Sequence, residues 1–265
     1  MIPQMQINFW KYLFGAGILG LILCSILIMI ILYLVKSKLQ HQRKLSLRDQ
    51  HIEHVPRFGG IGLFWGFLGT LILIWWVPIE QQLIGLEFLP QNRLAGLCIG
   101  GMLAWGIGFA DDVIDLRVRW KLAGQIVLSV LAIGLGFEIN TIQVPILQNI
   151  NLGPWSWPIT ILWIVGVINA INLIDGLDGL ASGLVIIALA CFGLLCLWQG
   201  QYSLLLLVFV LGGATLGFWL FNRPQASIFM GDSGSMFLGY VLALLSIWVT
   251  DLPGRGQSVL PLLIL

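Results

Sequence analysis

The chain has 265 residues, a formal net charge of +1 and a hydrophobic fraction of 58%. A mean hydropathy of +0.97 and only 9% charged residues exclude a soluble globular domain, so the composition predicts an integral membrane protein. A helix needs about 20 apolar residues to cross a bilayer. The short alternating segments of a transmembrane β-barrel are not seen. We therefore expect an all-α, polytopic helix bundle that forms a single domain over residues 1–265.

Apolar runs separated by polar interruptions predict eight membrane spans and the start of a ninth. The predicted spans are 12–35, 59–77, 92–110, 121–138, 158–174, 183–198, 203–221 and 234–250, with a further start at 258. The first run lacks a small-residue cleavage site and is too long for a signal peptide, so we expect a retained anchor. The four cysteines lack the spacing of a metal or redox site, which indicates packing.

The breaks after spans one, three, five and seven carry the polar motifs, and by parity they lie on one face of the membrane. This face holds ten of the 13 basic residues, and the other three are Lys11, Arg93 and Arg255. The positive-inside rule therefore predicts a cytoplasmic motif face and an external N-terminus. Acidic residues are biased towards the same face although they do not orient membrane proteins, which indicates a cytoplasmic site.

The break after span three reads "FADDVIDLRVRWKLAGQI" and begins with two adjacent carboxylates, Asp111 and Asp112. Adjacent carboxylates repel each other unless a cation or a proton neutralises part of their charge. A divalent metal or a basic phosphate clamp would do this. The alternative is a solvated helix end with ordinary charges.

The break after span five reads "NAINLIDGLDGLASG". Its polar residues lie three positions apart: Asn169, Asn172, Asp175 and Asp178. On a helix this spacing predicts a slanted polar stripe, and the nearby Gly176 and Gly179 would let the backbone approach a ligand closely. Helix caps and a glycine turn are the alternative, but they account for only one aspartate and one glycine.

The break after span seven reads "FNRPQASIFMGDSGS" and contains Asn222 and Asp232. Asp232 at the entry to the next span could cap that helix or bind an ion. Together with the oxygen ligands of the other breaks, it favours a hard cation, Mg²⁺ or alternatively Mn²⁺, over zinc or copper. Magnesium in turn indicates a phosphate substrate.

The break after span one, "RKLSLRDQHIEHVPRFGG", supplies positively charged side chains. Arg48, His51 and Arg57 precede Gly59 and Gly60, which predicts a basic, flexible entrance suited to phosphate oxygens. The alternative is that these charges serve only the positive-inside rule and the attraction of anionic headgroups.

The four motifs in this order resemble the polyprenyl-phosphate N-acetylhexosamine-1-phosphate transferases, glycosyltransferase family 4. The resemblance covers about residues 48 to 235 and rests on "RDQHIEHVPRFGG", on "DDVIDL" with Lys121 and Gln125, on "NAINLIDGLDGLA" and on "FMGDSGS". The paired aspartates of the third motif and the Arg-x-x-His pattern of the first look closer to the bacterial O-antigen and teichoic-acid initiators. The resemblance implies transfer of a sugar 1-phosphate from a UDP-sugar to undecaprenyl phosphate, with release of UMP, at the start of cell-envelope polysaccharide or lipopolysaccharide synthesis.

The resemblance also implies roles for particular residues. Asn172 and Asp232 would bind Mg²⁺ on the diphosphate, and Asp111 and Asp112 would be the catalytic pair that holds or deprotonates the lipid phosphate. The implied substrate-binding residues are Arg48, His51, Arg57, Lys121, Asp175, Asp178 and Asn222. The implied setting is the bacterial plasma membrane, with the bilayer, UDP-sugar and undecaprenyl phosphate as partners. No nucleic-acid partner is expected, and a homodimer stays open.

Three departures from the family pattern are visible. Ser227 stands where relatives commonly carry a basic residue, and His54 where many have proline. The chain also stops at Leu265, eight residues into an apolar run, so we expect further spans and a histidine-rich loop beyond it. The alternatives to a transferase are a cation-coupled transporter, which would need acids facing one another inside the spans, and a non-catalytic scaffold relative.

Overall fold

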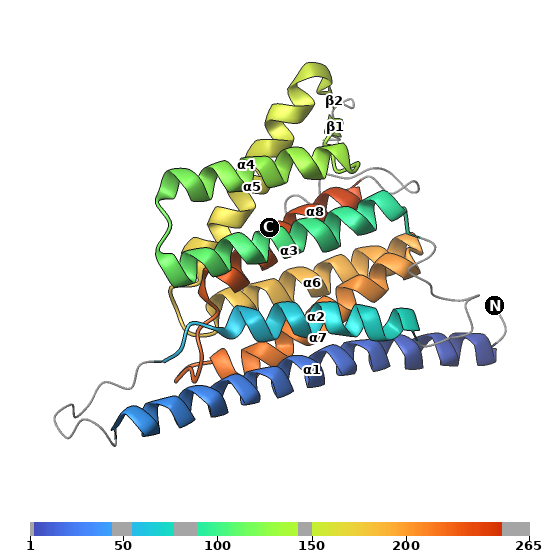
Figure 1. Cartoon of the computed structure of the whole chain (residues 1–265). Coiled ribbons are helices and arrows are strands. Elements are labelled where there is room, and N and C mark those ends of the chain that lie inside the picture. Colours follow the sequence, from blue (N-terminus) through green and yellow to red (C-terminus); the bar gives the residue numbers. More distant parts are fainter. Residues whose placement is uncertain (1–2, 44–54, 77–88, 143–149, 251–265) are drawn as a thin grey trace.

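The computed structural model describes residues 3–43, 55–76, 89–142 and 150–250. Eight helices form the described part of the chain. They are α1 (Pro3–Arg43), α2 (Gly59–Trp76), α3 (Gln91–Ile114), α4 (Val118–Gly134), α5 (Ser156–Ile174), α6 (Leu180–Gln199), α7 (Tyr202–Asn222) and α8 (Gly231–Thr250). They pack side by side as a bundle, as Figure 1 shows. The predicted all-α membrane fold is confirmed.

The connection between α4 and α5 contains more regular structure than the sequence predicted. Two short strands, β1 (Thr141–Ile142) and β2 (Ile150–Asn151), pair antiparallel, with Thr141 opposite Asn151. A single turn of 3-10 helix, Gly153–Trp155, then leads into α5. Two-residue strands are too short to leave a period-two hydrophobic pattern, so the sequence could not reveal them.

Each of the eight complete predicted spans corresponds to one helix, with differences at the ends. Helix α1 extends beyond the predicted span at both ends, because the helical path continues past the apolar residues that defined the span. Helix α4 is displaced towards the N-terminus, since the chain turns at Leu135 and at Gly136, which has a φ of 93°. The start predicted at 258 lies outside the described residues.

Seven of the described helices are long and apolar enough to cross a membrane, which makes the chain a multi-pass membrane protein. The eighth, α4, has 17 residues and carries Arg119 and Lys121 near its start. At about 1.5 Å per residue it is about 25 Å long, a little shorter than the hydrocarbon core of about 30 Å. Helix α4 is therefore not counted among the membrane-crossing helices of the described residues.

Helix α8 is the centre of the bundle. It packs against α2, α3, α5 and α6, and 94% of its most apolar window is buried. Small residues let its first turn approach the neighbouring backbones closely. A Cβ atom on Gly60 of α2 would lie 2.7 Å from the Cα of Gly234, and one on Gly108 of α3 would lie 2.6 Å from the Cα of Ser233. The start of α8 is thus held by direct backbone packing.

The described residues of the four motif-bearing segments lie at one end of the bundle (Figure 1, left). The ends of α1, α3, α5 and α7 and the starts of α2, α4, α6 and α8 meet there. Backbone hydrogen bonds join two of the segments, from the N–H of Phe229 to Pro56 O (2.9 Å) and from the N–H of Gly60 to Met230 O (2.8 Å). The described motif residues therefore share one end of the bundle, which is called the motif end below, while its side of the membrane stays a prediction.

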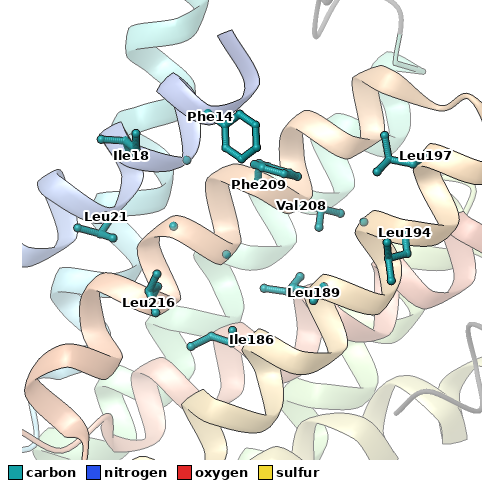
Figure 2. A pocket seen from close by; sticks show the side chains of 15 residues that line it. Phe14, Ile18, Leu21, Ile186, Leu189, Leu194, Leu197, Val208, Phe209 and Leu216 are labelled. Carbon is teal, nitrogen blue, oxygen red and sulfur yellow. The ribbon is translucent and has the colours of Figure 1, made fainter. Parts of the chain in front are cut away.

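A groove of about 510 Å³ lies between α1, α6 and α7, nearer the opposite end (Figure 2). Its lining consists only of apolar side chains and glycines, among them Phe14, Leu189 and Phe209. In a bilayer such a surface faces lipid chains, which are as apolar as the groove itself. It offers no group for chemistry, so the functional site belongs to the motif end.

The opposite ends of α7 test the orientation of the bundle. A reporter fused after Arg223, at the motif end, is expected to report the cytoplasm, and one fused after Gly200 is expected to report the outer side, because basic residues are retained inside. A pair of phosphatase and fluorescent-protein fusions at each position measures this. Reversed signals would contradict a cytoplasmic motif end.

Candidate functional site

The adjacent carboxylates at the end of α3 point to different partners. Asp111 Oδ1 accepts a hydrogen bond from the N–H of Leu116 (2.8 Å), and its Oδ2 accepts one from Lys121 Nζ (2.8 Å). Helix α3 ends directly afterwards because Asp115 adopts a left-handed backbone conformation, with a φ of 56°. Asp111 therefore holds the turn between α3 and α4 and orients Lys121 within it.

Asp112 binds the N-terminus of α8. Its Oδ1 accepts the N–H of Asp232 (2.7 Å) and its Oδ2 accepts the N–H of Ser233 (3.0 Å). These donors belong to the first turn of a helix, where N–H groups lack helical partners and the helix dipole favours a negative charge. Gly231 makes the approach possible, because its φ is 75° and a Cβ atom there would lie 2.8 Å from Asp112 Oδ2. Asp112 thus positions Asp232.

Asp232 is the junction of the site. Its Oδ1 accepts a hydrogen bond from Lys121 Nζ (2.8 Å) and another from Asn172 Nδ2. Asn172 Nδ2 also donates to Ser235 Oγ (2.8 Å). One network therefore joins α3, α4, α5 and α8, and it contains the two implied metal ligands, Asn172 and Asp232, together with Lys121.

Asp175 directly follows α5 and is half-buried beside this network. Burial and, after it, the negative charges of Asp232 and Asp112 together raise the pKa of its carboxyl from 3.8 to about 7. Together, Asp111, Asp112, Asp175 and Asp232 are called the acidic cluster below. Within the described ranges, Lys121 is the cation that forms ion pairs with this cluster. The cluster therefore carries surplus negative charge.

The donors of the acidic cluster suit a hard divalent cation, since they are all carboxylate or amide oxygens and their negative charge exceeds that of their lysine partner. Even so, among the residues that the structure describes, no three His, Cys, Asp or Glu side chains are placed to hold one ion. The contacts explain this. Asp112 is occupied by the backbone of α8, and Lys121 lies between Asp111 and Asp232.

The polar stripe predicted along residues 169–178 is wrong at Asp178. Helix α5 ends at Ile174, and Gly179, with a φ of 72°, turns the chain into α6. Asp178 is consequently exposed, and its Oδ2 accepts the N–H of Ala226 (3.1 Å) in the connection between α7 and α8. The structure therefore separates Asp178 from the acidic cluster.

Asn222 is buried and supports the same connection. Its Oδ1 accepts the N–H of Gly179 and the hydroxyl of Ser182, both at 3.1 Å, and its Nδ2 donates to Ile228 O (3.0 Å). Protein partners thus occupy its amide on both sides. The geometry gives Asn222 a supporting contact with the start of α6, while the nucleotide-sugar role that the sequence implied stays a prediction.

The basic entrance is only partly described. Arg48 and His51 lie outside the described residues. Arg57 is exposed, and its carbonyl oxygen would lie 2.6 Å from a Cβ atom on Gly231. The backbone of this segment therefore reaches the start of α8, as the predicted role in phosphate binding requires.

Two contributions were missed in the sequence. Ser235 Oγ accepts a hydrogen bond from Asn172 Nδ2. The side-chain amides of Gln125 and Asn169 form hydrogen bonds with each other. Asn169 Nδ2 donates to Gln125 Oε1 at 2.7 Å, and Gln125 Nε2 donates back to Asn169 Oδ1 at 3.4 Å. The available signal was spacing, because Gln125 follows Lys121 by four residues and so lies on the same face of α4.

Comparisons with known proteins agree with the site. The sequence model of glycosyl transferase family 4 matches residues 94–250, a region that includes the whole acidic cluster. The chain is 33% identical over 203 residues to a Bacillus subtilis protein named "probable undecaprenyl-phosphate N-acetylglucosaminyl 1-phosphate transferase", covering 76% of this chain and 53% of that protein.

Two further relatives have similar names. The decaprenyl-phosphate N-acetylglucosaminephosphotransferase of Mycobacterium tuberculosis is 35% identical over 207 residues, which cover 74% of this chain and 50% of the relative. The phospho-N-acetylmuramoyl-pentapeptide-transferase of Listeria monocytogenes is 41% identical over 167 residues, covering 58% and 51%. The chain thus spans about half the length of the curated relatives it matches.

The contact between Asp112 and α8 predicts a stability effect. Asp112→Ala is expected to lower the free energy of unfolding by about 1–3 kcal/mol, because two backbone N–H groups lose a charged acceptor. Thermal unfolding in detergent measures this. Asp178→Ala, which removes one exposed hydrogen bond, is the control and should change the melting temperature less. Equal shifts in the two variants would contradict the assignment.

The raised pKa of Asp175 predicts that replacing this residue stabilises the protein, and that the gain depends on pH. The folded protein holds this proton up to a pH of about 7, whereas the ordinary pKa is 3.8, so the stability contributed by the group falls as pH rises between these values. Asp175→Asn removes that loss and should raise the melting temperature more at pH 8 than at pH 5. The comparison is made with a chelator present. An equal rise in melting temperature at both pH values would contradict the inference that burying the charged form of Asp175 destabilises the folded protein.

Proposed function

Because the chain belongs to glycosyl transferase family 4, we propose that it transfers an N-acetylhexosamine 1-phosphate from a UDP-sugar to undecaprenyl phosphate and releases UMP. The names of the relatives support this class of reaction, since each names a phospho-sugar or N-acetylglucosaminyl 1-phosphate transferase, and two name a polyprenyl phosphate. The proposed setting is the cytoplasmic face of a bacterial plasma membrane.

The observation that carries the proposal is the ion-paired network of Asp111, Lys121 and Asp232 at the motif end. Phosphoryl transfer needs positioning and neutralisation of charge more than it needs covalent participation by the protein. The network supplies both, because it fixes an ammonium group and several oxygen ligands at the edge of the membrane. A lipid phosphate anchored in the bilayer would arrive at this edge.

In the proposed reaction, an oxygen of the lipid phosphate attacks the β-phosphorus of the UDP-sugar. The bond between that phosphorus and the bridging oxygen breaks, and the oxygen leaves with UMP. A phosphomonoester with a second pKa near 6 is already mostly dianionic at neutral pH, so it needs little help from a general base. Asp111 then acts by orienting Lys121 towards the phosphates, and Asp112 acts by holding Asp232 in place.

Asn172 and Asp232 are the proposed holders of Mg²⁺, with Mn²⁺ as an alternative. When bound, the ion would supply positive charge to the diphosphate of the donor. Asp175, which is half-buried beside the cluster, is the better-placed of the predicted nucleotide-sugar residues, because Asn222 is occupied by protein contacts and Asp178 faces Ala226. Arg48, His51 and Arg57 are proposed to bind phosphate oxygens at the entrance.

The reaction can be tested in membranes that contain the protein expressed from its complete gene. Incubation with undecaprenyl phosphate and radiolabelled UDP-N-acetylhexosamines should give a butanol-soluble labelled lipid and UMP. Asp232→Asn and Asn172→Ala are each expected to lower the rate by about 100-fold or more, because positioned charge is lost from the site. Both variants should remain in the membrane.

Glu138→Gln is the matched control, since it makes the same change from carboxylate to amide beside Ser156, at the opposite end of the bundle. It should keep most of the activity. If wild-type membranes give no labelled lipid with any UDP-N-acetylhexosamine, the proposed reaction is wrong. That result, combined with uptake of a cation, would favour a transporter, and without such uptake it would favour a scaffold relative.

A further inference from the structure

The ammonium group of Lys121 lies between carboxylates from two different helices. Its Nζ is 2.8 Å from Asp111 Oδ2 on α3 and 2.8 Å from Asp232 Oδ1 on α8. The lysine side chain is 15% exposed and that of Asp111 only 9%, so water screens this pair weakly. Two carboxylate oxygens converging on one point are also what a hard divalent cation requires.

Among the described residues, Lys121 is the only positively charged side chain that forms ion pairs with the carboxylates of the acidic cluster. Asp112 is occupied by the first turn of α8, and the carboxylate of Asp175 makes no hydrogen bond or ion pair within the described ranges. Asn172 donates its amide nitrogen to Asp232, so its amide oxygen is directed to neither Asp232 nor Ser235. A cation arriving at Asp232 would therefore have to displace the ammonium group of Lys121, and the amide N–H of Asn172 would have to turn away from Asp232 Oδ1.

Helix α4 is fixed close to this point. Gln125, one turn after Lys121, is fully buried and pairs with Asn169 of α5 through two amide hydrogen bonds. Buried amide pairs in a low-dielectric interior resist separation, because each lost partner leaves a polar group unsatisfied. The backbone that carries Lys121 thus stays in place, and only its flexible four-carbon side chain is free to change position.

We propose that Lys121 occupies the divalent-cation position of the acidic cluster, and that a cation binds there by displacing its ammonium group. The inference rests on the proposed function for the identity of the cation. The displaced ammonium group then becomes available to the phosphate oxygens that the substrates bring. Lysine in the metal-free protein and the cation in the loaded protein therefore neutralise the same carboxylates in turn.

The test is Mn²⁺ binding to the purified full-length protein in detergent, measured from the electron paramagnetic resonance signal of free Mn²⁺. Lys121→Met removes the competing charge and keeps most of the side-chain volume, so it should bind Mn²⁺ roughly tenfold more tightly than wild type. Lys121→Arg keeps a cation with a fork that suits two carboxylates, so it should bind Mn²⁺ more weakly.

Arg119→Met is the matched control. It removes a positive charge from the same helix, but Arg119 is exposed and its guanidinium lies over Trp120, 5.8 Å from the ring centroid. Its Mn²⁺ affinity should match wild type. The proposed exchange of the Lys121 ammonium group for a cation is wrong if Lys121→Met binds Mn²⁺ no more tightly than wild type. It is also wrong if Arg119→Met tightens Mn²⁺ binding equally, because that result would indicate a long-range charge effect.

The Mn²⁺ affinity of Asp232→Asn tests the metal site of the proposed function separately from the exchange. If wild type and Asp232→Asn bind Mn²⁺ equally weakly, then Asp232 is not a ligand, and the proposed metal site fails together with the exchange. If Asp232→Asn loses the binding seen in wild type while Lys121→Met leaves it unchanged, the metal site stands and only the exchange is overturned. The two failures are therefore distinguishable without measuring transfer.

Discussion

The first turn of α8 has to satisfy its backbone N–H groups inside a membrane protein, and the rest of the site follows from how it does so. Helix α8 is almost completely enclosed by its neighbours and Ser233 is fully buried, so the N–H of Ser233 depends on an acceptor from the protein. Asp112 supplies the acceptor from α3. Because the same turn carries Asp232, the contact also fixes where that carboxylate meets Lys121 and Asn172.

Much of this arrangement could be predicted from the sequence. Hydropathy located the eight helices, and parity placed Asp111, Lys121, Asn172 and Asp232 at one end of the bundle before any contact was known. The prediction works because a membrane allows few ways to thread a chain: each span must cross, so alternate connections return to the same side.

Contacts that depend on the direction of a side chain could not be predicted. Asp111 and Asp112 are identical neighbours in the sequence, yet one holds a lysine and the other a helix end, because successive residues on a helix point about 100° apart. The predicted stripe failed at Asp178 for a related reason. Its spacing assumed a continuous helix, whereas α5 ends at Ile174 and Gly179, in the left-handed conformation, leads into α6.

The close packing around Gly60, Gly108 and Gly234 means that main-chain atoms, rather than side chains, set the dimensions of the motif end. A lipid-facing wall built from leucine and valine can exchange one apolar residue for another and keep its volume. A contact between backbones has no such freedom, since any added carbon pushes the helices apart. The lipid-facing outside of this bundle can therefore exchange one apolar side chain for another, while the spacing between α2, α3 and α8 leaves no room for an added side chain at these glycines.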